Sequence, residues 1–150
     1  MDLQEELKVL KQRIAELECH DKKQKFPQDG DKYWYVDDIG ILWLSVFGKG
    51  ELSNDRVEMG NVFRTKEEAG FVAEKLKIEA ELRKFSKPFE YGKFNYNLLF
   101  DIDGNNFRTD VTSYCPSQGA IYFESVEKAQ EAVSTIGEER IKKYLFGVED

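Results

Sequence analysis

The chain has 150 residues, which is about one domain, and 41% of them are apolar, so it can bury a modest core. A formal charge of -7 argues against a sequence-independent phosphate-binding surface and against direct nucleic-acid binding. An aromatic content of 13% argues against global disorder, and no apolar run approaches the roughly 20 residues of a membrane-spanning helix. The acidic start is unlike a signal peptide, so we expect a soluble intracellular protein with no membrane partner.

The first 20 residues carry the heptad pattern of a coiled coil. Apolar side chains alternate at spacings of four and three, which places them at the a and d positions: Leu3, Leu7, Leu10, Ile14 and Leu17. In a parallel pair Glu6 then faces Lys11 of the partner, and Arg13 faces Glu18, so both pairs have opposite charges. The sequence predicts a homo-oligomer through this helix, followed by a polar linker over residues 21–32. The alternative is an amphipathic helix packed on its own domain.

A repeated pattern follows the linker. Two strand-turn-strand segments are each followed by a short apolar strand and by a helix that begins at Thr65 or at Ser125. The two helices keep the same apolar positions at a constant offset, for example Ala69 with Ala129. The predicted fold class is therefore α+β, with a coiled-coil helix at residues 1–20 and an α+β domain at residues 33–150. That domain contains two copies of a ββ-β-α unit with antiparallel sheet, at residues 33–85 and 94–146.

The two copies differ in their apolar surfaces. The first helix has a second apolar stripe, where the second copy carries mainly charged residues: Phe71, Ile78, Leu82 and Phe85. This stripe predicts an interface with the N-terminal helix, a second subunit or an external partner, and an intramolecular contact remains the alternative. Residues 41–47 are apolar at both strand parities, so we expect both faces of that strand to be covered.

The sequence contains no recognisable catalytic or cofactor motif. The acidic turn around Asp103 and Gly104 has its glycine too early for a calcium loop, and it predicts a primed hairpin turn in which Asp-Gly supplies positive φ values. His20 lies in a polar segment, and Cys19 and Cys115 are far apart in the sequence. We therefore predict no catalytic residue, no cofactor, no metal and no enzymatic activity.

Three segments resemble a family of small acidic phage and prophage proteins. They are residues 63–69, residues 121–132 and, most specifically, residues 136–148 with the sequence IGEERIKKYLFGV. The N-terminal heptads also fit this family. The resemblance implies a phage-derived binding protein in the host bacterial cytoplasm, with a host protein as its partner. The family supplies no catalytic or binding residues to carry over.

Counter-defence is the function that this resemblance favours, by analogy. In that reading the protein inhibits a host effector such as a CRISPR-type nuclease, with its carboxylates occupying a basic groove. Two alternatives remain open: an oligomeric sponge that sequesters a nucleotide immune signal in a pocket lined by aromatic and basic residues, and a virion structural or assembly protein.

Overall fold

A computed structural model of the chain describes residues 2–48 and 50–149. These residues form an α+β fold with an N-terminal helix, which confirms the predicted fold class. The fold divides into two compact units, residues 1–69 and 70–150, and the division falls inside one helix. That helix contributes its first turn to the first unit and its remaining turns to the second.

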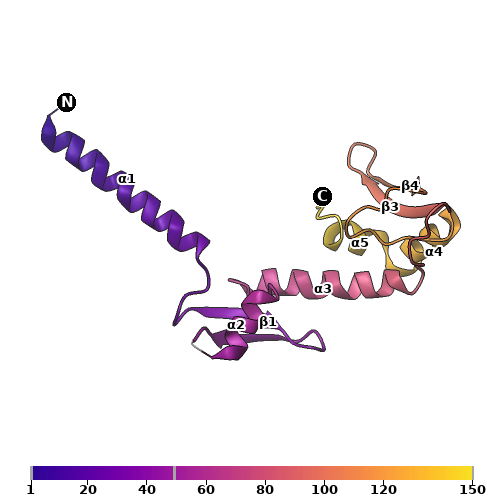
Figure 1. Cartoon of the computed structure of the whole chain (residues 1–150), viewed down its shortest axis with the longest axis horizontal. Coiled ribbons are helices and arrows are strands. Elements are labelled where there is room, and N and C mark those ends of the chain that lie inside the picture. The colour runs from indigo at the N-terminus through magenta and orange to yellow at the C-terminus, as the bar shows by residue number, and fades with distance from the viewer. Residues whose placement is uncertain (1, 49, 150) are drawn as a thin grey trace. The chain divides into compact units, whose positions relative to one another are not determined.

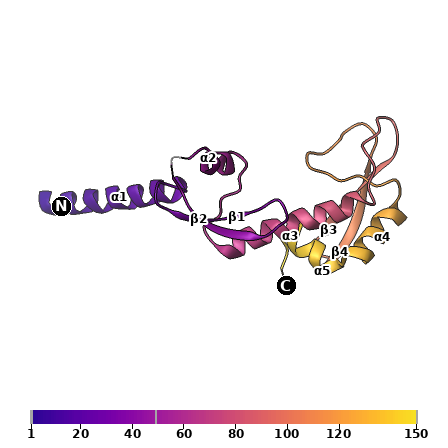
Figure 2. The ribbon, with the colours of Figure 1, turned by 90° about the horizontal axis from the view of Figure 1, so that it is seen from below.

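The first unit begins with helix α1 (Leu3–Gln24), followed by the antiparallel hairpin of β1 (Lys32–Val36) and β2 (Leu42–Val46) and by helix α2 (Glu51–Glu58) (Figure 1). The predicted linker at residues 21–32 is shorter than expected, because α1 continues to Gln24. Figure 2 shows α2 on one side of the hairpin, where the Tyr33 hydroxyl accepts a hydrogen bond of 2.9 Å from Arg56 of this helix. Tyr33 is fully buried and belongs to the core.

The first hairpin turns around Asp37 and Gly40. The Asp37 carboxylate accepts hydrogen bonds from the backbone N–H groups of Ile39 and Ile41 and from the Trp43 indole, and Gly40 has a φ of 86°. The bond from Trp43 is the main reason why the pKa of Asp37 lies below its ordinary value, and the backbone bonds add to it. The carboxylate therefore holds the turn together in its charged form.

The second unit contains most of α3 (Lys66–Arg83), the hairpin of β3 (Asn95–Asp101) and β4 (Asn106–Thr112), and helices α4 (Val126–Ile136) and α5 (Glu138–Tyr144). Ser125 caps α4, since its hydroxyl accepts a hydrogen bond of 3.1 Å from the backbone N–H of Lys128. Gly137 separates α4 from α5 with a φ of 110°, a conformation that favours glycine.

The same order of hairpin, third strand segment and helix occurs in both halves of the chain. Phe63 pairs with Trp34 of β1, and Phe123 pairs with Tyr96 of β3, each in antiparallel orientation. Thr65 then begins α3 as Ser125 begins α4, and the N–H of Glu68 donates to the Thr65 hydroxyl at 3.2 Å. In both halves, therefore, the residue two positions before the helix cap extends the hairpin by one backbone pairing.

The second hairpin is confirmed, but its predicted turn geometry is wrong. The residue with positive φ is Asn105, at 50°, and not Gly104. A Cβ atom at Gly104 would lie 3.0 Å from an oxygen of Asp101 and closer still to the Asn106 side chain, so these two side chains would have to move to admit a larger residue. Asp101 accepts a hydrogen bond of 3.1 Å from the Gly104 N–H, so the carboxylate occupies the volume that a side chain would need.

The core of the second unit explains the second apolar stripe of α3. Ile78 and Leu82 are 0% and 1% exposed and pack with Phe123 and with the inner face of α4 and α5: Ala129, Ala132, Val133, Ile136 and Ile141. Phe85 packs against the same cluster, and the rings of Phe71 and Tyr144 lie 5.1 Å apart. The structure therefore corrects the predicted interface: the stripe forms the intramolecular contact that the sequence left as the alternative.

Candidate functional site

The apolar seam of α1 is exposed along its whole length. Every side chain from Asp2 to His20 is exposed, and the five seam residues are between 52% and 82% exposed: Leu3, Leu7, Leu10, Ile14 and Leu17. The alternative of an amphipathic helix packed on its own domain also stays a prediction. Self-association through α1 stays a prediction, and its seam is available for it.

The charged residues beside the seam are also accessible. Arg13 forms an ion pair of 3.4 Å with Glu16 of the same helix, and its side chain remains 69% exposed. An exposed pair of this kind contributes little stability, so Arg13 can exchange Glu16 for an acidic residue of a partner at small cost.

Strand β2 presents a second exposed apolar surface. The prediction that both of its faces are covered is wrong, because about half of each of four side chains is exposed: Ile41, Trp43, Leu44 and Val46. The reason is the position of β2 at the edge of the sheet. Neighbouring segments cover the central strand β1, where Tyr33 and Val36 are buried, and they do not extend over β2.

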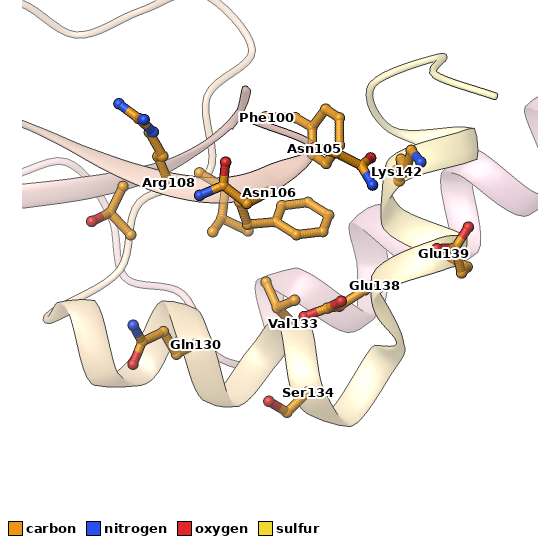
Figure 3. A pocket seen from close by; sticks show the side chains of 13 residues that line it. Phe100, Asn105, Asn106, Arg108, Gln130, Val133, Ser134, Glu138, Glu139 and Lys142 are labelled. Atoms are coloured by element: carbon orange, nitrogen blue, oxygen red, sulfur yellow. The ribbon is translucent and has the colours of Figure 1, made fainter. Parts of the chain in front are cut away.

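A groove of about 760 Å³ lies between the second hairpin and helices α4 and α5. Figure 3 shows Phe100 and Asn105 at the end of the hairpin beside Lys142 of α5, with Gln130 and Ser134 on α4 opposite the strands. The Lys142 ammonium lies 5.6 Å from the centre of the Phe100 ring, and this lysine is 3% exposed. The groove thus combines an aromatic wall with amide and hydroxyl groups.

The charges around this groove balance one another. Arg108 and Lys142 are matched by Glu138 and Glu139, and the Arg108 guanidinium already forms an ion pair of 2.9 Å with Asp101. Figure 3 shows the Arg108 side chain directed away from α4. A nucleotide phosphate would need cations that face the groove, so this arrangement does not favour a polyanionic ligand.

Tyr33 lies in a polar cluster with Ser53 and Arg56. Burial raises the pKa of the Tyr33 hydroxyl, but hydrogen bonds with Ser53 and Arg56 and the charge of Arg56 outweigh burial, so the net pKa lies below its ordinary value. Among residues 2–48 and 50–149, no group of three or more His, Cys, Asp or Glu side chains is placed to hold a metal ion. Cys19 and Cys115 are exposed free thiols. The prediction of a non-enzyme stays a prediction.

No family model, curated protein or solved structure matches this chain. The resemblance to phage proteins therefore stays a prediction. Within the described part of the chain, no helix is long and apolar enough to cross a membrane.

Proposed function

We propose that this protein is a non-enzymatic binding protein that self-associates through α1 as a parallel coiled coil. The observation that carries the proposal is the exposed a/d seam of Leu3, Leu7, Leu10, Ile14 and Leu17 on a 22-residue helix. An isolated helix of about this length is marginally stable in water, and burying its apolar stripe against a second helix would stabilise it. The opposite charges of Glu6 and Lys11, and of Arg13 and Glu18, favour the parallel arrangement.

Leu10→Lys with Ile14→Lys should abolish this association. A pair of helices would lose four buried side chains, each contributing at least about 1.5 kcal/mol, which corresponds to a weakening of more than about 10,000-fold. Sedimentation equilibrium of the full chain at tens of micromolar measures the change.

The matched control is Val9→Lys with Gln12→Lys. Val9 is 57% exposed, close to the 59% of Leu10, both residues lie outside the seam, and the two changes add the same positive charge as the test variant. The control should associate as the unmodified chain does. Equal loss of association in both variants would contradict the assignment of the seam as the association surface.

We further propose that the partner of the assembled protein is a host bacterial protein, and that a CRISPR-type nuclease is the class of target. The support is the sequence resemblance, together with a net charge of -7 that is complementary to a basic nucleic-acid groove. The alternatives are an oligomeric sponge that sequesters a nucleotide signal in a pocket between copies of the chain, and a virion structural or assembly protein.

Expression of the full chain in bacteria that carry such a nuclease system should restore plating of a targeted phage by at least about tenfold. The purified chain should also inhibit the nuclease in a salt-dependent manner, because screening weakens exposed charge pairs. Unchanged plating together with unchanged cleavage would contradict counter-defence. Incorporation of the chain into purified virions would instead support the structural alternative.

A further inference from the structure

We infer that the free edge of β2 pairs antiparallel with β2 of a second copy of this chain, joining the two hairpins into one continuous sheet. The pairing surface consists of residues 41–47 and lies outside α1. It is therefore a second self-association surface, independent of the coiled coil.

The backbone groups of successive residues in β1 point alternately toward β2 and away from it. The N–H and C=O groups of Trp34 pair with Phe63 at 2.8 and 2.9 Å, and those of Val36 bond to the Asn61 side chain at 2.8 and 2.7 Å. Trp34 and Val36 therefore direct their backbone groups away from β2. Tyr33 and Tyr35, which alternate with them, direct theirs toward β2.

The register of the hairpin determines which residues of β2 bond to β1. Tyr33 is opposite Ser45 and Tyr35 is opposite Trp43, so Ser45 and Trp43 use their backbone groups to bond with β1. The alternating residues of β2 direct their N–H and C=O groups outward: Leu42, Leu44 and Val46. Among the described residues, no other segment forms a backbone hydrogen bond with these three.

The composition of β2 leaves its free edge unprotected against pairing. Free edges are normally protected against pairing by a charged residue, a proline or a bulge. Residues 41–47 contain no charged residue and no proline, and the strand pairs with β1 through five consecutive residues without a bulge. Together with the exposure of Trp43, Leu44 and Val46, this unprotected edge indicates a surface that is occupied in the working protein.

Self-complementarity identifies the occupant as a second copy. A two-fold axis at Leu44 places Leu44 opposite its own counterpart and Leu42 opposite Val46, so that all outward backbone groups find partners. On the face of the sheet that carries Leu42, Leu44 and Val46, all contacts between the two copies are apolar. Because Trp34 lies opposite Leu44 in each hairpin, the central row of the joined sheet would read Trp34, Leu44, Leu44 and Trp34. On the other face Trp43 lies opposite Ser45. No like charges meet within the paired strands.

Hydrogen exchange of individual amides tests the pairing in the full chain. The sample carries Leu10→Lys and Ile14→Lys, so that any remaining association does not depend on α1. In this sample the amides of Leu42, Leu44 and Val46 should become protected as the concentration rises into the hundreds of micromolar, by at least about tenfold. The amides of Trp43 and Ser45 bond to β1 and should be protected at all concentrations.

Adding Leu44→Lys should remove this concentration-dependent protection and give a monomeric mass by sedimentation, since two like charges would meet at the two-fold axis. The matched control is Leu52→Lys on α2, which is 62% exposed and outside the strand. It should retain the association. Protection of Trp43 and Ser45 in both variants shows that the hairpin has folded.

Free exchange of Leu42, Leu44 and Val46 at every concentration, with Trp43 and Ser45 protected, would overturn the inference. A strand from a different protein would then be the alternative occupant of the edge. Because α1 is inactivated in this sample, that result would leave the proposed coiled coil unaffected. Conversely, if the unmodified chain did not associate through α1, the protection of the β2 amides in the variant with Leu10→Lys and Ile14→Lys would be unchanged.

Discussion

Replacing Ile78 by glutamate is expected to unfold the second unit at neutral pH. The Ile78 side chain is 0% exposed and lies among Leu82, Phe123 and the inner faces of α4 and α5. Loss of the aliphatic side chain alone costs about 2–5 kcal/mol. A carboxylate buried there without a partner adds several kcal/mol more, of the order of the whole stability of a small domain.

Amide hydrogen exchange in α4 measures the outcome, because this helix supplies four buried residues to the same core. The expected result is loss of protection there, with loss of helical dichroism. The matched control is Leu76→Glu, two residues away on the same helix, where the side chain is 54% exposed. This control should change stability by no more than about 0.5 kcal/mol. Cooperative folding of Ile78→Glu with wild-type stability would contradict the assignment of this residue to the core.

Asn95→Ala is expected to cost about 2–4 kcal/mol, since each buried polar group left without a partner costs about 1–3 kcal/mol. Asn95 is fully buried at the start of β3, and its side chain bonds to the segment before this strand and to the end of β4. Its side-chain oxygen accepts hydrogen bonds from the Lys87 ammonium and the Glu90 N–H, at 3.0 and 2.9 Å. Its amide group donates to the carbonyl oxygens of Glu90, Lys93 and Thr112.

Urea unfolding followed by amide exchange in β3 and β4 gives the size of this effect. Asn106→Ala in the same hairpin is the control, because Asn106 is exposed, and it should unfold with a midpoint close to that of the unmodified chain. If the two variants were equally stable, water would have replaced the Asn95 hydrogen bonds at no cost. The network would then be incidental to the fold.

Several elements of this protein could be predicted from the sequence because short-range interactions determine them. The Asp37 turn and the Ser125 cap each depend on hydrogen bonds that span only a few residues, and the Gly137 break depends on the conformation of one residue. The heptad seam of α1 is likewise a matter of spacing within one helix. In each case the physical cause lies inside a window that a local pattern covers.

The exact turn at Asn105 was not predictable in the same way. An Asp-Gly pair usually supplies the positive φ of a hairpin turn, but here the Asp101 carboxylate lies close to Gly104 and the positive φ falls on Asn105. Asn95 also gave no signal in the sequence, because its role depends on backbone groups that converge from residues 87–93 and from Thr112.

The sequence by itself determined which surfaces of this protein are apolar, and the tertiary structure decided which of them are covered. The stripe of Ile78 and Leu82 and the strand of Leu44 and Val46 are both unusually apolar in the sequence. The first is buried because α4 and α5 pack onto α3, and the second is exposed because β2 has a neighbour on one side only. The hydrophobic effect favours burial of either surface equally, and only the long-range arrangement of the chain determines which one meets a partner within the same molecule.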